Sequence, residues 1–136
     1  MSVPPLGPPR VLLVDGDFRS SQRLASLLEE DGFCVDVVRD GRSAVRRLAA
    51  LPLPNILITE LHVPLIDGVT IARSARAHNP DLQIVVLTRH PNQPLPPAFG
   101  SMPPVVLSKP LDYARLMEVL LVESPAARGL RAASHG

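Results

Sequence analysis

The sequence predicts an α/β domain built on a parallel β-sheet, and three observations support this prediction. Short apolar runs of strand length alternate with longer segments that have helical periodicity. Most of the short runs are apolar along their whole length, which is typical of strands that helices cover on both faces. Crossovers between parallel strands are right-handed, so few topologies remain.

Five apolar runs are the predicted strands. The first, RVLLVD, is rich in valine and leucine and has the length of a strand buried on both faces. The five predicted strands cover residues 10–15, 33–38, 56–59, 83–88 and 105–108.

Four segments have the periodicity of amphipathic helices. We expect Asp17 to cap the first helix, which carries Leu24, Leu27 and Leu28 on one face and ends at Gly32. The other three helices are predicted over residues 40–51, 67–78 and 112–122. The second of the four has a basic face that we expect to be solvated, or to meet an acidic partner, formed by Arg42, Arg46 and Arg47.

One connection and the two chain ends lack such patterns. Residues 89–104 contain six prolines in sixteen residues, too many for a regular helix, so an irregular loop is expected where a fourth helix would normally lie. The predicted domain covers residues 10–122. Residues 1–9 form a proline-rich tail, and residues 123–136 are expected to be disordered.

Length and composition exclude several classes of protein. The 136 residues, 46% of them hydrophobic, suit one globular domain. A net charge of +1 and an aromatic content of 3% disfavour nucleic acid and anionic membranes as partners. A single cysteine, Cys34, cannot form an internal disulfide, and neither a signal peptide nor a membrane span is visible. We therefore expect a soluble, cytoplasmic protein in which Cys34 is a core residue.

Polar side chains follow four of the predicted strands. They are Asp15, Glu60, Thr88 and Lys109, which is the only lysine in the chain and precedes Pro110. Because the carboxyl ends of parallel strands meet at one edge of the sheet, we expect these side chains to converge. Two acids, a hydroxyl and an ammonium could bind a phosphoryl group or a divalent cation.

The segments VLLVDGD, ILITELHVPLIDG, IVVLT and SKPLD, in this order and spacing, resemble the receiver domain of two-component response regulators over about residues 10–121. The resemblance implies a doubly wound, five-stranded, flavodoxin-like fold. It also implies that a phosphoryl group is transferred from a sensor His to an Asp at the end of the third strand. In this family Mg²⁺ is held by acids that follow the first strand. The expected partner is a signalling protein: a sensor kinase, an output protein or another regulator.

Four positions match the receiver pattern. Thr88 matches the switch hydroxyl, Lys109 the lysine that contacts phosphate, Pro110 the proline that follows it, and Asp15 the first acid of the metal-binding pair.

Other positions depart from the pattern. Glu60 stands where receivers carry the phosphoacceptor Asp, and Gly16 stands where they carry a direct metal ligand. Asp17 is acidic but one residue later, where a helix cap is the simpler role. Arg89 replaces the small residue after the threonine, and Val106 replaces an aromatic switch residue.

These departures predict a degenerate receiver, or pseudo-receiver, that is not phosphorylated in the usual way. A Glu carboxylate lies roughly 1.5 Å further from the backbone than that of Asp, and misplacement of this size costs a transfer reaction about a hundredfold in rate. We therefore expect an ion pair between Glu60 and Lys109, no resident Mg²⁺, no enzymatic activity, and a stand-alone module that acts by binding proteins.

Alternatives stay open. Glu60 could accept a phosphoryl group, with Mg²⁺ held by Asp15 and Asp17. The chain could instead be a small nucleotide-binding α/β protein, although it lacks a GxGxxG or GxxxxGK[ST] loop. Glu60 could also be an ordinary exposed acid. His62 and His90 give only a weak zinc signal.

Overall fold

A computed structural model of the chain describes residues 7–90, 92 and 104–123. The described part contains five strands in a single parallel sheet with the order β2-β1-β3-β4-β5. This architecture confirms the predicted doubly wound fold. The elements in chain order are β1 (Arg10–Val14), α1 (Phe18–Glu30), β2 (Cys34–Val38), α2 (Gly41–Leu48), β3 (Ile56–Glu60), α3 (Gly68–His78), β4 (Gln83–Thr88), β5 (Val105–Ser108) and α4 (Tyr113–Glu123).

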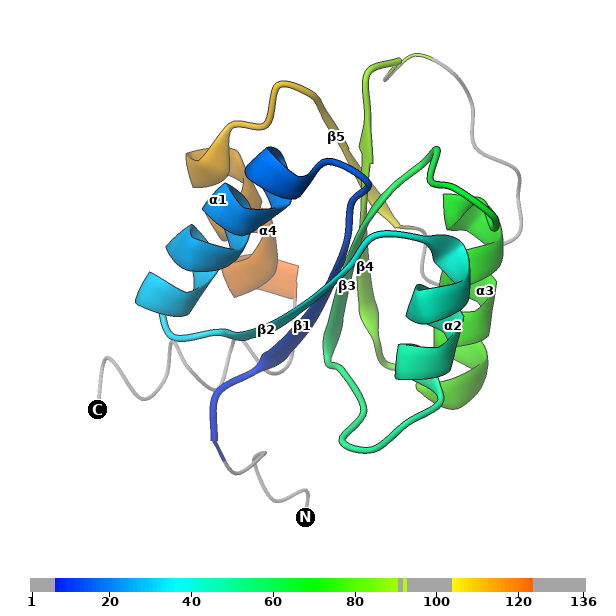
Figure 1. Cartoon of the computed structure of the whole chain (residues 1–136). Helices are drawn as coiled ribbons and strands as arrows, with labels where there is room; N and C mark the ends of the chain where they lie inside the picture. Colours follow the sequence, from blue (N-terminus) through cyan, green and yellow to red (C-terminus); the bar gives the residue numbers. More distant parts are fainter. Residues whose placement is uncertain (1–6, 91, 93–103, 124–136) are drawn as a thin grey trace.

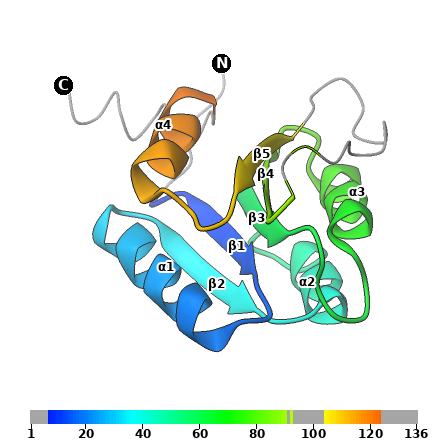
Figure 2. The same ribbon diagram turned by 90° about the horizontal axis from the view of Figure 1, so that it is seen from above.

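Helices cover both faces of the sheet. α1 and α4 lie on one face and α2 and α3 on the other, so the domain has three layers (Figure 1). Figure 2, turned by a right angle, shows the same layers from above. Side chains alternate along β1, so Val11 and Leu13 pack toward one helical layer while Leu12 and Val14 pack toward the other. Two aliphatic clusters result, one on each side of the sheet.

The edge strand β2 is less buried than the central strands. Among the described strands β2 pairs with β1 alone, and its Asp36 is exposed, where its carboxylate lies 2.9 Å from the Arg47 guanidinium of α2. Cys34 is half-buried at the start of this strand, and an Arg10 nitrogen lies 3.6 Å from its sulfur. The prediction that Cys34 is a core residue is therefore wrong, because β2 lies at the edge of the sheet that the described strands form.

Aspartates precede all four described helices, and Asp112 before α4 accepts the backbone N–H groups of Ala114 and Arg115. In the other three helices Asp17 caps α1, Asp40 caps α2 and Asp67 caps α3, each accepting a backbone N–H of the first turn. Gly32 has a φ of 96°, so the chain leaves α1 through a left-handed residue, as the sequence indicates. α2 ends at Leu48, three residues before the predicted end. The sequence prediction overran because prolines disfavour helical backbone in the residues that precede them.

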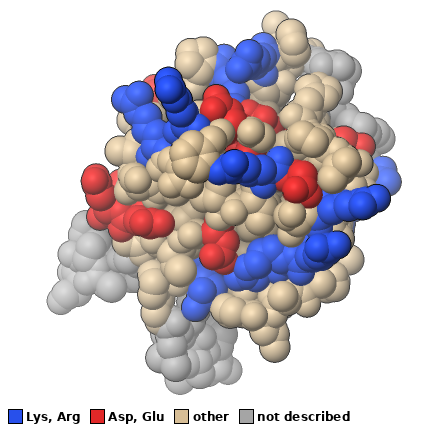
Figure 3. Space-filling model, viewed as in Figure 1, with Lys and Arg blue, Asp and Glu red and all other residues tan. Residues whose placement is uncertain are grey.

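The basic face of α2 is partly neutralised. Arg42 and Arg46 are exposed, whereas Arg47 pairs with Asp36. Both basic and acidic side chains appear on the face seen in Figure 3, and basic side chains lie side by side at its lower right.

The predicted proline-rich loop falls largely on residues 91 and 93–103, which lie outside the described residues, as do residues 1–6 and 124–136 of the predicted tails. Among the described residues no helix separates β4 from β5, and these strands pair in parallel from Val85 with Val105 to Thr88 with Ser108. No helix in the described part is both long and apolar enough to cross a membrane.

Candidate functional site

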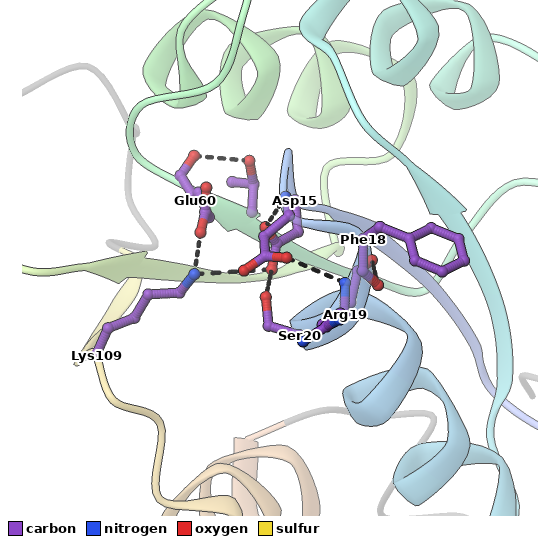
Figure 4. Close-up of polar contacts among 9 residues, drawn as sticks. Asp15, Phe18, Arg19, Ser20, Glu60 and Lys109 are labelled. Carbon is purple, nitrogen blue, oxygen red and sulfur yellow. Dashed lines mark hydrogen bonds and ion pairs between the residues drawn. The ribbon is translucent and has the colours of Figure 1, made fainter.

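The predicted site residues lie at the carboxyl edge of the sheet. Asp15 follows β1, Glu60 ends β3, Thr88 ends β4 and Lys109 follows β5. In Figure 4 the Lys109 ammonium points between the carboxylates of Asp15 and Glu60. The sheet topology therefore brings together residues that are far apart in the sequence.

Lys109 holds the two acids together. Its Nζ donates to Glu60 Oε1 and lies 3.7 Å from Asp15 Oδ2. The side chains are 14% exposed for Lys109, 20% for Glu60 and 3% for Asp15, so water screens this cluster only in part. The structure thus contains the ion pair that the sequence predicts, and adds Asp15 as a second acid beside the ammonium.

Both oxygens of the Asp15 carboxylate are engaged. Oδ1 accepts the backbone N–H of Asp17 at 2.8 Å, and Oδ2 accepts the Ser20 hydroxyl at 3.1 Å (Figure 4). Asp15 is a buried charge, and these bonds together with the nearby ammonium compensate it.

Asp17 has a different role from Asp15. Its carboxylate accepts the Arg19 N–H at 3.0 Å at the start of α1 and forms no ion pair with any described residue. The next side chain, Phe18, points away from the carboxylates, and the Arg39 guanidinium lies 4.3 Å from its ring centre. Asp17 therefore acts as the helix cap that the sequence favours.

Gly16 leaves open space beside the acids. It is exposed, and a Cβ atom at this position would meet only Pro64 Cδ at 3.7 Å and the Arg39 carbonyl oxygen at 3.9 Å. These are ordinary contact distances, so the backbone would accept a longer side chain here.

Thr88 and Glu60 share a small pocket. The pocket has a volume of about 120 Å³, and its lining also includes Lys109, His62 and His90. The Thr88 hydroxyl accepts the His90 N–H at 3.0 Å, while its carbonyl accepts the Lys109 N–H at 2.8 Å. Thr88 thus ties the segment after β4 to the residue that carries the ammonium.

His62 and His90 line this same small pocket. Within residues 7–90, 92 and 104–123, no group of three or more His, Cys, Asp or Glu side chains is arranged to hold a metal ion.

The turn after β3 fixes the backbone of Glu60. The N–H of Gly68 donates to the Leu61 carbonyl at 2.9 Å, and a Cβ at position 68 would lie 2.6 Å from the Glu60 carbonyl oxygen. Only glycine allows this approach. Between Glu60 and Gly68 the chain makes a γ-turn centred on Leu65. Leu65 has a φ of 75°, and the Ile66 N–H donates to the Pro64 carbonyl, which is the strained form of this turn.

Comparison with known proteins decides the family. The model of the response regulator receiver domain matches residues 11–121. The chain belongs to this family. It is 32% identical over 117 residues to the response regulator receiver protein CpdR of Brucella abortus, covering 83% of this chain and 97% of CpdR.

The comparisons also include a longer relative and a solved structure with the same fold. Response regulator MprA of Mycolicibacterium vanbaalenii is 33% identical over 81 residues, which are 60% of this chain but only 35% of MprA. The receiver domain of an HD domain-containing protein from Pseudomonas fluorescens superposes with a TM-score of 0.74 at 23% identity, covering 98% of this chain and 97% of that one. The chain therefore spans about a third of MprA and nearly all of CpdR.

Sequence reasoning missed Ser20 in this receiver. Its hydroxyl donates a hydrogen bond to the Asp15 carboxylate, beside the Asp17 N–H and the Lys109 ammonium. Ser20 precedes the buried Leu24 by four residues, so helical periodicity alone could have placed it on the inward face of α1. Pro110 lies where predicted, after Lys109, and lines a second and larger pocket on the α1 side.

Proposed function

We propose that this receiver domain works in two-component signalling as a pseudo-receiver. In this proposal the Glu60–Lys109 ion pair takes the place of the phosphorylation cycle, and the domain acts by binding a protein partner. The observation that carries the proposal is the position of the Lys109 ammonium, which contacts Glu60 and lies 3.7 Å from Asp15.

The ion pair opposes phosphoryl transfer to Glu60. A carboxylate that accepts a phosphoryl group must approach phosphorus in line, and here one Glu60 oxygen is bound to Lys109. Transfer would require that contact to break in a site where water screens the charges only in part. The extra methylene of Glu also opposes phosphoryl transfer, because it moves the carboxylate away from the position that an Asp carboxylate would occupy.

The donor set does not fit a divalent cation. A resident Mg²⁺ would need oxygen ligands, yet both oxygens of Asp15 accept hydrogen bonds from Asp17 and Ser20. Gly16 offers no side chain, and the space between Asp15 and Glu60 already holds an ammonium group. These observations support a domain without a resident metal.

The same features support a role without enzymatic activity. Among the described residues of the site, both acids are engaged by the Lys109 ammonium, and neither is presented as an activated nucleophile. Output then passes through the surface of the domain. The partner in this proposal is a signalling protein, that is, a sensor kinase, an output protein or another regulator.

Intact mass measurement after incubation with a small acyl phosphate and Mg²⁺ tests this function. The expected result is an unmodified wild-type chain, identical in mass to a Glu60→Gln variant treated in the same way. A phosphoryl mass on the wild type that is missing from Glu60→Gln would overturn the proposal in favour of a working acceptor.

One observation favours that second candidate. The pocket of about 120 Å³ brings Glu60 and Thr88 together beside Lys109, the combination that a phosphoacceptor site requires. A functional receiver that accepts on Glu60 is therefore the alternative function.

A further inference from the structure

We propose that a second pocket on the α1 side of the site binds a small amphipathic organic anion, such as an aryl or alkyl carboxylate, sulfonate or phosphate. The pocket has a volume of about 690 Å³ and lies between α1, the end of β4 and the connection from β5 to α4. This inference goes beyond the proposed function and does not depend on whether Glu60 is phosphorylated.

The pocket has an apolar wall. Leu24 and Leu27 contribute from α1, Leu87 from β4, and Pro110 with Leu111 from the connection to α4. Leu24 and Leu87 are buried members of the core cluster on this face of the sheet, so this wall is part of the rigid interior. α1 and α4 lie on that same face of the sheet (Figure 1), and α4 contributes Tyr113 to the lining. An apolar body of a ligand would be desolvated here.

Two arginines supply the charge complementarity. Arg23 of α1 and Arg89, directly after β4, both line the pocket and are exposed. Neither guanidinium forms an ion pair with another described residue, whereas Lys109 at the pocket's inner end is already paired. Of the two acids in the lining, Asp15 is buried beside Lys109, which leaves Asp17 as the exposed one. The exposed lining therefore carries an excess of positive charge, which favours an anion.

Size and shape favour a small molecule over a macromolecule. Pockets for small ligands commonly measure roughly 300–1,000 Å³ and combine apolar walls with a few polar anchors. The volume of about 690 Å³ and the two arginines fit that description.

Tyr113 strengthens one wall of the pocket. Its hydroxyl lies 3.0 Å from the Leu27 carbonyl oxygen and 2.6 Å from Asp31 Oδ2, so it links the start of α4 to the end of α1. The pocket also includes Lys109 and Pro110, so an occupant would contact the residues that position the Glu60 ion pair. A bound ligand would therefore contact Lys109 and could change its ion pair with Glu60.

Fluorescence titration with anilinonaphthalene sulfonate, an amphipathic aromatic anion, tests the proposal. We expect saturable binding at one site per chain. Arg23→Gln and Arg89→Gln should each weaken binding by about tenfold, because each removes one charge-assisted contact. Arg42→Gln is the matched control, since it removes an exposed arginine from α2 on the other face of the sheet and should leave the affinity unchanged. Circular dichroism checks that the variants stay folded.

Methyl NMR with the same probe locates the site. The proposal requires shifts of the Leu24 and Leu27 methyl groups and competition by an alkyl carboxylate or a nucleoside monophosphate. Binding that does not saturate, equal losses in Arg42→Gln and Arg23→Gln, or shifts confined to the exposed Leu65 would each overturn it. None of these outcomes bears on the phosphorylation assay, so the two proposals fail separately.

Discussion

Lys109 contributes more to this receiver than a single contact. It is the only lysine in a chain with thirteen arginines, and its ammonium lies between two carboxylates that would otherwise face each other at the edge of the sheet. A compact ammonium on a flexible stem suits that narrow position better than a planar guanidinium. We therefore expect that removing the Lys109 ammonium lowers the stability of the folded domain.

Replacing Lys109 with Met should lower the free energy of unfolding by about 2 kcal/mol, because two partly buried acids lose their shared cation. Urea unfolding measures the change. The control is Arg115→Met, which removes an exposed pair with Glu118 at 3.1 Å and should cost less than about 0.5 kcal/mol. Equal costs for the two variants would show that the Lys109 contacts are as weak as a surface pair.

Two glycines beside the site have opposite requirements. Gly68 approaches the Glu60 carbonyl so closely that a Cβ would overlap it, whereas Gly16 has room. Gly68→Ala should therefore destabilise the domain by about 1–3 kcal/mol, the usual cost of forced overpacking. Gly16→Ala should change stability by less than about 0.5 kcal/mol. Thermal unfolding of the two variants checks this order, and the reverse order would contradict the close approach of α3 to β3.

At the level of the elements, Tyr113 joins α4 to α1. Burial, followed by the hydrogen bond to Asp31, raises the pKa of the Tyr113 phenol well above its ordinary value of 10.0. The folded state thus favours the neutral phenol. The resulting stabilisation is fully present below the pKa that the Tyr113 phenol has in the unfolded chain. It is lost as the pH rises from that value through the higher pKa of the folded state.

Because Tyr113 is the only tyrosine, the ultraviolet absorbance of tyrosinate reports it alone. We expect no ionisation of the folded protein near pH 10.0, the ordinary pKa of the group. Tyr113→Phe should lose about 1 kcal/mol of stability at neutral pH and be less sensitive to alkali. A phenol that titrates with its ordinary pKa while the domain stays folded would contradict the link between the helices.

For the whole molecule, the sequence could predict the features that repeat along the chain. Alternating apolar runs predict the parallel sheet, and its topology predicts that Asp15, Glu60, Thr88 and Lys109 meet. It could not predict that β2 is the exposed edge, which leaves Cys34 half-buried, because strand order is not encoded in any one segment. The larger pocket was missed for the same reason, since Arg23 and Arg89 come from separate elements.

The departures at positions 16 and 60 are the central feature of this receiver. A Cβ at position 16 would meet only ordinary contacts, so Gly16→Asp with Glu60→Asp should rebuild an acceptor site on an intact scaffold. The most direct test is intact mass after treatment with an acyl phosphate and Mg²⁺, applied to the wild type and the double variant together. Our account predicts a phosphoryl mass on the double variant and none on the wild type. A phosphorylated wild type, or a double variant that folds but stays unmodified, would contradict it.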